Sequence, residues 1–415
     1  MKLPLGRVAQ SIGAEGDFPG DVMALGYSID SRTIKPGELF FAVKGERLDG
    51  HDYVTTAMER GAVGAVIGRK HLGRYVDKRH FLVVDKEDAL PALQKLGAKV
   101  RLLWGKKLVA VTGSAGKTTT KEMIGQILAT KFNVLKSQGN LNNHFGLPLQ
   151  LLKLETEHAV AVVELGMSHA GEIAALTAMA KPDIGVVTNV APVHLEYFDS
   201  IEGIAKAKKE LIEALPTDGI AVLNADDERV SKFGKGFSGK IIRYGTSQDA
   251  DMRAENFESI GELGSRFTVN NGGSNAHVEL PLMGKHNVLN ALAAIAVGSC
   301  FGVALAESAK ALSEMKPEEK RGEVLHIAGV TIINDCYNSN PLALKSMVDV
   351  LAVMPAKRRI VVAGEMLELG PAAETMHCEC GEYLATKVDI LFGVQGLASS
   401  MVRSAREKKI GCNLF

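Results

Sequence analysis

The chain has 415 residues, which is more than one hydrophobic core usually serves, so two or three domains are expected. Lys and Arg together number 48, as do Asp and Glu; no net charge attracts nucleic acid or an anionic membrane, and a polyanionic ligand must be held by a local site. The five cysteines are odd in number and scattered, which is typical of reduced thiols in a cytoplasmic protein.

No segment predicts export, membrane insertion or a zinc site. Residues 1–17 lack a sustained apolar stretch, so a signal peptide is not expected. The apolar residues 291–306 fall short of the ~20 residues that a membrane span needs and predict a core helix instead. Cys378 and Cys380 have no second cysteine pair at zinc-binding spacing.

Residues 1–86 predict a small α/β domain. The apolar residues 39–43 suit a buried strand, a helix is expected over 52–60, and a second strand over 62–67. Asp30-Ser31-Arg32 precedes these elements, and taken alone it is most simply a surface turn with a charge pair.

Residues 87–313 form the second predicted domain, which carries the clearest motif. A strand over 108–111 is followed by a glycine-bearing turn and a helix over 117–129. Such a turn aims backbone N–H groups and the positive end of a helix dipole at an anion. The general pattern for this turn has glycine where the chain has Val111, so the match is to the narrower TGxxGKT form. The predicted nucleotide-binding residues of the turn are Thr112, Gly113, Ser114, Ala115, Gly116, Lys117, Thr118 and Thr119.

Side chains of this domain suit a phosphate-transfer site. Lys117 would bridge the β- and γ-phosphates, and the Thr118 hydroxyl would ligate Mg²⁺. Glu164 and His194 each follow a predicted parallel strand, over 159–163 and 184–188, at the edge of the sheet where ligands bind. Glu164 could hold Mg²⁺ or pair with a lysine; His194 could reach the same site or simply pack.

Two further features of this domain leave alternatives open. Asn140, Asn142 and Asn143 lie in one short loop, which suits either a polar substrate or an ordered bend. Lys208 falls within the apolar stripe of a helix predicted over 200–215. Either its aliphatic side chain is buried and its ammonium group reaches solvent, or it is a modified or paired functional group.

Residues 314–415 predict a third, smaller α/β domain with a parallel sheet. Strands are expected over 330–334 and 360–363, with a helix over 342–353 between them. Polar residues follow the first strand, at Asp335 and beyond. This domain could supply groups to a nucleotide that the second domain holds.

Taken together, the motifs resemble those of the ATP-dependent Mur ligases of peptidoglycan precursor synthesis. The resemblance covers nearly the whole chain and keeps the motifs in order. They are Asp30-Ser31-Arg32, Asp49-Gly50-His51, the turn 112–118 with Lys121-Glu122, residues 139–143 with 146–148, Glu164-Leu165-Gly166, His194-Leu195-Glu196, residues 205–208, residues 286–290 and residues 335–341.

The resemblance implies the fold and the reaction. The fold is α/β with three domains: a central P-loop-type, mainly parallel sheet, flanked by a small N-terminal α/β domain and a Rossmann-like C-terminal α/β domain. The reaction implied is that of an ATP-dependent ligase that would join D-alanyl-D-alanine to UDP-N-acetylmuramoyl-tripeptide through an acyl phosphate. A cytoplasmic monomer with no nucleic-acid partner and no stable membrane insertion is expected.

The resemblance also implies roles for individual residues. By this resemblance Thr118 and Glu164 would hold one Mg²⁺, and His194 and a carbamylated Lys208 would support a second. Ser31 and Arg32 would bind the UDP-sugar end, and the loop with Asn140, Asn142 and Asn143 would contact substrate. The remaining residues expected to contact the nucleotide are Asn290, Arg321, Asp335 and Asn338.

The chain departs from the family pattern at two points. The chain has Gly364-Glu365-Met366 where the family more often has Gly-Asp-Met. It also ends at Phe415, short of the final segment that members usually carry, so the third domain is expected to lack that segment. The alternatives are a folylpolyglutamate-type ligase, which uses the same ATP chemistry on another carboxylate, and an inactive ATP-binding paralogue.

Overall fold

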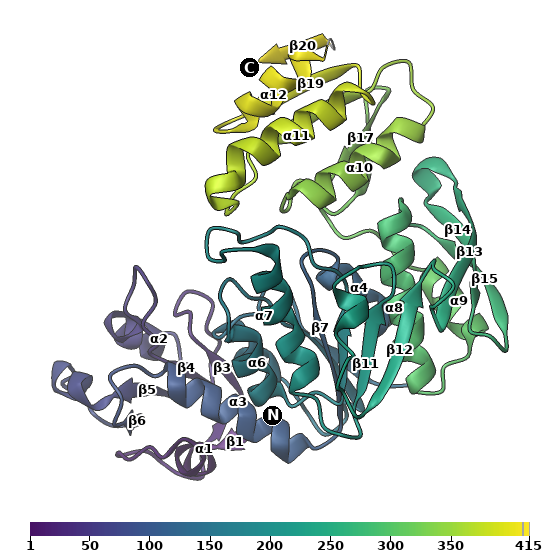
Figure 1. Cartoon of the computed structure of the whole chain (residues 1–415). Coiled ribbons are helices and arrows are strands. Elements are labelled where there is room, and N and C mark those ends of the chain that lie inside the picture. Colours follow the sequence, from purple (N-terminus) through teal and green to yellow (C-terminus); the bar gives the residue numbers. More distant parts are fainter. Residues whose placement is uncertain (409–410, 415) are drawn as a thin grey trace. The chain divides into compact units, whose positions relative to one another are not determined.

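The computed structural model describes residues 1–408 and 411–414, and strands and helices alternate along most of the chain (Figure 1). Contacts divide it into two compact units. Unit 1 holds Met1–Ala110, Phe132–Leu165 and Ala175–Pro182; unit 2 holds Val111–Lys131, Gly166–Ala174 and Asp183–Phe415. The predicted boundaries at residues 86 and 313 cut the chain at two positions in sequence, whereas the two units are defined by contacts between residues. The boundaries therefore stay predictions.

The N-terminal part of unit 1 is built on a four-stranded parallel sheet in the order β3-β4-β5-β6. Its core includes Phe40, Ile67 and Phe81. The strands expected over 39–43 and 62–67 are thereby confirmed. The element bounds are β1 Leu3–Pro4, α1 Leu5–Ile12, β2 Met23–Ala24, β3 Gly26–Ser28, β4 Glu38–Phe41, η1 Gly50–Tyr53, α2 Val54–Glu59, β5 Gly64–Gly68, η2 Arg69–Arg74 and β6 Phe81–Val84.

A nine-stranded sheet has the order β15-β14-β13-β12-β11-β10-β7-β9-β8. The pairs β8–β9 and β10 to β13 are parallel, whereas β13, β14 and β15 pair antiparallel. The strands are β7 Lys107–Thr112, β8 Val134–Lys136, β9 Val160–Glu164, β10 Ile184–Val187, β11 Ile220–Asn224, β12 Lys240–Gly245, β13 Met252–Ser259, β14 Ser265–Asn270 and β15 Asn275–Leu280. The prediction of a large, mainly parallel central sheet is confirmed.

The helices that follow these strands bury the apolar faces that their sequences present. The core helix predicted over 291–306 is α8, which ends at Cys300 and buries Val288 and residues 290–298. Ser200 caps α7 by accepting the Gly203 N–H. The helix bounds are α3 Leu90–Trp104, α4 Lys117–Leu128, α5 Gly146–Leu151, α6 Glu172–Ala180, α7 Ile201–Glu213, η3 Val230–Lys232, η4 Gly261–Leu263, α8 Lys285–Cys300 and α9 Leu305–Ser313.

The C-terminal part of unit 2 contains a hairpin, β16–β17, and a parallel sheet, β18-β19-β20. Leu384, Leu391 and Met401 lie in its core, and α11 and α12 pack against each other (Figure 1). The strands expected over 330–334 and 360–363 and the helix between them are confirmed. However, the first of these strands, β17, pairs antiparallel with β16 in the hairpin and is not part of the parallel sheet that contains β18. The bounds are β16 Glu323–Ile327, β17 Val330–Asn334, α10 Pro341–Val353, β18 Ile360–Gly364, η5 Gly370–Ala372, α11 Ala373–Ala385, β19 Ile390–Val394, α12 Ala398–Glu407 and β20 Gly411–Leu414.

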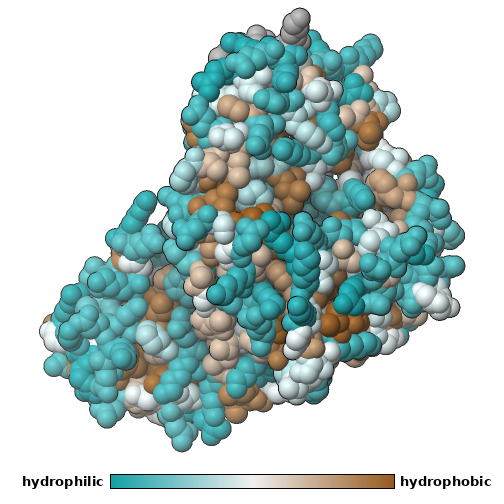
Figure 2. Space-filling view, viewed as in Figure 1, coloured by the Kyte–Doolittle hydropathy of each residue, from teal (hydrophilic) through white to brown (hydrophobic). Residues whose placement is uncertain are grey.

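Hydrophilic residues predominate on the face shown in Figure 2. Among the helices that the structure describes, none combines the length and the apolarity needed to cross a membrane. The expectation of a missing final segment concerns sequence beyond Phe415 and lies outside the described residues.

Candidate functional site

The predicted phosphate turn lies between β7 and α4, and its two glycines approach their neighbours too closely for a side chain. Gly113 has φ 151°, and a Cβ there would lie 1.8 Å from Thr188 Oγ1. Gly116 has φ 79°, and its Cβ would lie 2.5 Å from Asn290 Oδ1. Only glycine accommodates both the conformation and the contact, so the turn is tight and leads directly into α4.

Residues just after β10 hold the turn in place through hydrogen bonds. The Ser114 N–H donates to the Asn189 carbonyl (3.0 Å) and the Ala115 N–H to Asn189 Oδ1 (2.9 Å). Thr188 Oγ1 donates to the Ala115 carbonyl (2.6 Å), and Ser114 Oγ to the Ala191 carbonyl (3.1 Å). The sequence prediction missed Thr188 and Asn189. Their only local signal is that two polar residues follow a buried strand.

Lys117 opens α4 at the end of the turn. Its Nζ donates to the Gly113 carbonyl (2.9 Å), which draws the ammonium back over the turn. Gly116 offers no side chain to cap the helix, and the first amides of an α-helix lack acceptors within the helix. Thr112 is buried at the end of β7, and Thr118 and Thr119 are half-buried on α4. This arrangement suits an anion at the positive end of the helix dipole.

Two more basic groups, Lys208 and His194, lie near enough to Lys117 to interact with it electrostatically. Lys208 is only 2% exposed on α7, and burial, followed by repulsion from Lys117, holds its pKa well below the usual lysine range. Burial also lowers the pKa of His194, while Glu368 opposes that shift. The structure thus brings three predicted site residues together, and it confirms that Lys208 faces inward.

Glu164 ends β9 in unit 1 and is 3% exposed. Its N–H donates to Ser137 Oγ (3.1 Å), and its Oε1 accepts from Asn142 Nδ2 (2.8 Å). Asn143 instead stabilises the backbone bend, because its Oδ1 accepts hydrogen bonds from the N–H groups of residues 145 and 146 at 3.2 and 2.9 Å. The asparagine loop therefore both contacts a predicted metal ligand and orders its own backbone. Asn140 is exposed.

Asn290 lies on α8 beside the turn. Its Oδ1 accepts from Thr120 Oγ1 (3.2 Å), and its Nδ2 donates to Asn287 Oδ1 (3.1 Å). Together with the close approach of Gly116, these bonds fix the amide against the start of α4. Its expected contact with the nucleotide stays a prediction.

The predicted nucleotide contacts of the C-terminal part lie around β17. The Arg321 guanidinium stands over the Tyr337 ring, 4.0 Å from its centroid, and its Nε pairs with Glu318 (3.2 Å). Burial raises the pKa of Asp335, which follows β17, to about 6. Asn338 is exposed.

In the turn after β3, Ser31 is buried, and Arg32 forms a two-pronged pair with Asp30 at 2.9 and 2.8 Å. This is the local charge pair that the spacing predicts. The pair lowers the pKa of the Asp30 carboxyl. The exposed Arg32 guanidinium is positioned on the surface of unit 1.

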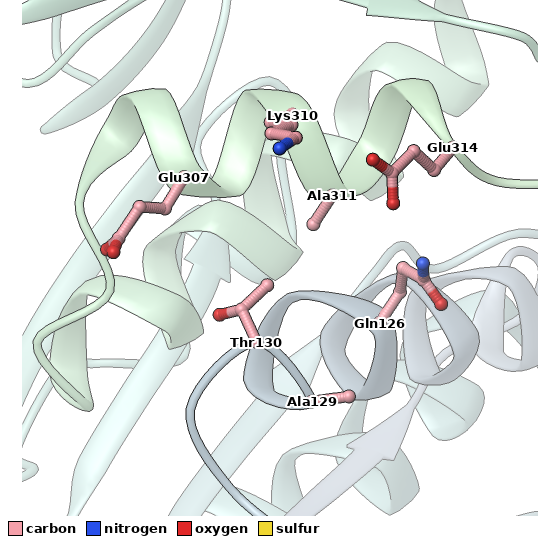
Figure 3. Close-up of a pocket in the computed structure, with 7 residues that line it drawn as sticks. All are labelled: Gln126, Ala129, Thr130, Glu307, Lys310, Ala311 and Glu314. Atoms are coloured by element: carbon pink, nitrogen blue, oxygen red, sulfur yellow. The ribbon is translucent and has the colours of Figure 1, made fainter.

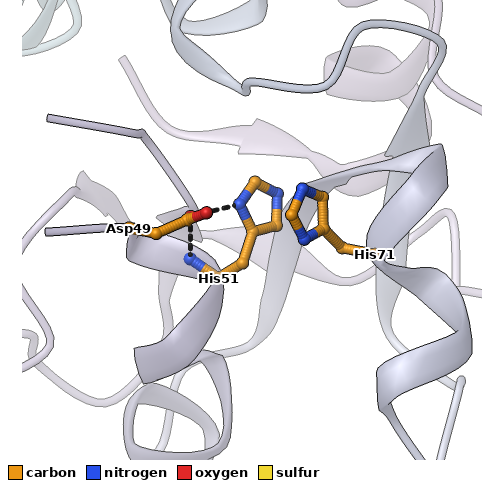
Figure 4. Close-up of side chains that lie close together, drawn as sticks. All are labelled: Asp49, His51 and His71. Carbon is orange, nitrogen blue, oxygen red and sulfur yellow. Dashed lines mark hydrogen bonds and ion pairs between the residues drawn. The ribbon is translucent and has the colours of Figure 1, made fainter.

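Asp49, His51 and His71 place potential metal-ligand atoms within 4.8 Å of one another (Figure 4). However, His51 Nδ1 bonds to Asp49 Oδ1 (2.7 Å), and His51 Nε2 accepts the Gly68 N–H (3.0 Å). The two imidazole rings stack with centroids 3.6 Å apart. Because both nitrogens of His51 are engaged, this grouping organises the loop after β4 and is no ready metal centre.

A pocket of about 380 Å³ lies at the far end of α4, between that helix and α9 (Figure 3). Gln126, the first of its lining residues, lies nine residues after Lys117 along α4, and at about 1.5 Å of rise per residue the two are roughly 14 Å apart along the helix axis. The pocket therefore does not belong to the phosphate turn. The residues that line it are Gln126, Ala129, Thr130, Glu307, Lys310, Ala311 and Glu314.

Comparison with known proteins agrees with this geometry. Three segments match family profiles: residues 25–138 the Mur ligase family catalytic domain, 111–298 the Mur ligase middle domain, and 320–411 the Mur ligase glutamate ligase domain. The UDP-N-acetylmuramoyl-tripeptide–D-alanyl-D-alanine ligase of Bacillus subtilis is 38% identical over 383 residues, which cover 92% of this chain and 82% of the relative.

Two solved structures are similar throughout. MurF from Acinetobacter baumannii superposes with a TM-score of 0.92 at 30% identity, covering 100% of this chain and 90% of that one. MurF ligase from Thermotoga maritima in complex with ADP gives 0.83 at 29% identity, covering 94% and 87%. Sequence and fold agree over nearly the whole length, and the chain therefore belongs to the Mur ligase family.

Proposed function

We propose that the chain is an ATP-dependent ligase that joins D-alanyl-D-alanine to UDP-N-acetylmuramoyl-tripeptide in peptidoglycan precursor synthesis. The observation that carries the proposal is the phosphate turn with buried Lys208 close to Lys117, in a chain that matches ligases of this name over most of its length. A folylpolyglutamate-type activity is not favoured, because these relatives share the tripeptide ligase name.

The reaction has two steps. The terminal carboxylate of the tripeptide attacks the γ-phosphorus of ATP, which yields an acyl phosphate and ADP. The amine of D-alanyl-D-alanine then attacks the acyl carbon, loses a proton, and expels inorganic phosphate through a tetrahedral intermediate. The protein must hold three reactants in line and neutralise charge, and it need not form a covalent bond itself.

Lys117 and the turn are suited to the polyphosphate. On binding, the ammonium would exchange the Gly113 carbonyl for phosphate oxygens, and the start of α4 would lie against the same anion. Thr118 and Glu164 offer a hydroxyl and a carboxylate, both hard oxygen ligands that Mg²⁺ prefers. Bound Mg²⁺ would neutralise charge on the phosphate oxygens.

Lys208 could act as a ligand of a second metal ion only after chemical modification. As an ammonium it would repel a cation, but its lowered pKa favours the neutral amine, which can add CO₂ and lose a proton to give a carbamate anion. The causes of the lowered pKa are burial first and the Lys117 charge second. A carbamate would remove the repulsion and, with His194, offer ligands for a second Mg²⁺.

Other roles follow the resemblance. Ser31 and Arg32 are proposed to bind the UDP-sugar, and Asn140, Asn142 and Asn143 to contact substrate near Glu164. Asn290, Arg321, Asp335 and Asn338 are proposed nucleotide contacts. A cytoplasmic location and a monomeric state remain predictions.

Phosphate release from ATP tests the proposed function. It should require both UDP-N-acetylmuramoyl-tripeptide and D-alanyl-D-alanine, and omission of either should leave only the background rate. Release driven by a folate and glutamate would favour the other ligase class. No release with any pair of substrates would favour the inactive paralogue.

A further inference from the structure

We propose that Glu368, in the loop after β18, is a positioning residue that orients the His194 imidazole and keeps its Nε2 available to the reaction centre. This inference rests on the proposed function, because it assumes that His194 acts at the phosphate site. It assigns a task to a residue outside the phosphate turn and outside the strand ends that surround it.

Three contacts fasten the Glu368 segment to the His194 segment. Glu368 Oε2 bonds to His194 Nδ1. The Glu196 N–H donates to the Glu368 carbonyl (3.2 Å). Gly370 comes so close that a Cβ on it would lie 2.9 Å from Glu196 Cα. A side-chain bond, a backbone bond and a close packing contact thus act on the same two short segments.

The backbone at both ends of the side-chain bond is unusual. His194 has φ 58° and Glu368 has φ 60°. Residues other than glycine rarely adopt this left-handed conformation, and they keep it where the surrounding contacts require it. Because both residues have this conformation and bond to each other, we infer that contact between the two loops maintains it.

The chemistry of the pair decides which imidazole nitrogen is free. A carboxylate only accepts hydrogen bonds, so the nitrogen that faces Glu368 must be the one that carries hydrogen. The tautomer is therefore Nδ1–H, and Nε2 keeps its lone pair. Histidines that ligate metals commonly have their other nitrogen held by a carboxylate in this way.

A purely stabilising ion pair explains the arrangement less well. The His194 and Glu368 side chains are 27% and 42% exposed, and ion pairs at such exposure add little to the stability of a fold. The contact does, however, join a loop after β18 to one after β10, 174 residues away. His194 is consequently oriented only when these two segments are together.

The test compares Glu368→Ala and Glu368→Gln with the control Glu374→Gln. Glu374 is an exposed carboxylate on α11 that pairs with Arg403 (2.8 Å). We expect Glu368→Ala to lower kcat by about 10- to 100-fold, the effect typical of residues that orient a metal ligand. The KM for the UDP-tripeptide should change less than about twofold. Glu368→Gln should retain part of the activity, since its amide oxygen still accepts a hydrogen bond.

A second readout does not depend on catalysis. Imidazole ¹⁵N spectra of the ligand-free protein, with His194 assigned by its substitution, should show the Nδ1–H tautomer in the wild type and in Glu374→Gln. In Glu368→Ala the Nε2–H tautomer should gain population. Thermal unfolding of each variant verifies that it is folded.

The two proposals fail in different ways. A wild-type protein that does not ligate the substrates counts against the proposed function, whatever its spectrum. A wild-type protein that ligates them, with Glu368→Ala equally active, counts against the role of Glu368 alone. A wild-type His194 in the Nε2–H tautomer also overturns that role.

Discussion

At the scale of single residues, the most informative group is Lys208. The helical spacing of apolar residues was enough to predict that this lysine faces inward, and the structure confirms it at 2% exposure. Spacing could not identify Glu368 as the partner of His194, because 174 residues separate them and no local pattern encodes the contact. Pairs of residues that are far apart in the chain but in contact in the fold cannot be identified from a single sequence.

Lys208 gives a prediction that separates modification from simple packing. Lys208→Ala should lower kcat by about 100-fold or more, as loss of a group that stabilises charge in the transition state typically does. Short carboxylates such as acetate should restore part of the activity by standing in for the carbamate. Removal of bicarbonate should reversibly lower the wild-type rate.

Lys206→Ala provides the matched control, because Lys206 lies on the same helix, two residues away, with its side chain exposed. It should behave as the wild type does in steady-state assays. Full activity of Lys208→Ala, or a wild-type rate indifferent to bicarbonate, would show that the buried lysine has only a packing role.

At the scale of elements, the sequence predicts the phosphate-binding type of the turn between β7 and α4. It does not predict the hydrogen bonds that hold this turn in place. An apolar run, glycines and a helix start are local signals, and the observed helix begins at the predicted Lys117. The bonds from Thr188 and Asn189 to the turn join segments more than 70 residues apart. Such bonds depend on β10 and the turn meeting in the fold, which spacing along the chain does not reveal.

This support makes Gly113 a sensitive position. In Gly113→Ala the new Cβ would meet Thr188 Oγ1 at 1.8 Å, so the turn must shift and the bond from Thr188 to Ala115 must weaken. We expect ATP binding, measured by calorimetry, to weaken about tenfold or more, which corresponds to about 1.4 kcal/mol.

Gly73→Ala is the control, because a Cβ at Gly73 meets no atom within 4 Å. It should bind ATP as the wild type does. Unchanged ATP affinity in a folded Gly113→Ala protein would mean that the turn is not the nucleotide site.

At the scale of the whole molecule, the α/β class and the large, mainly parallel sheet could be predicted because alternation of strand and helix is a local pattern repeated along the chain. The division into compact units could not. Unit 1 takes up residues 132–165 and 175–182 in addition to the N-terminal 110, so neighbours in space come from separate stretches of sequence. Contacts made by the fold, and not composition, decide such a division.

In the proposed reaction, the chain activates the tripeptide carboxylate as an acyl phosphate and transfers the acyl group to D-alanyl-D-alanine. The most direct measurement uses UDP-N-acetylmuramoyl-tripeptide labelled with ¹⁸O in its terminal carboxylate, with mass analysis of the inorganic phosphate released. One ¹⁸O atom should be transferred to phosphate for each amide bond formed. Phosphate without ¹⁸O, despite formation of the amide, would contradict the acyl-phosphate mechanism.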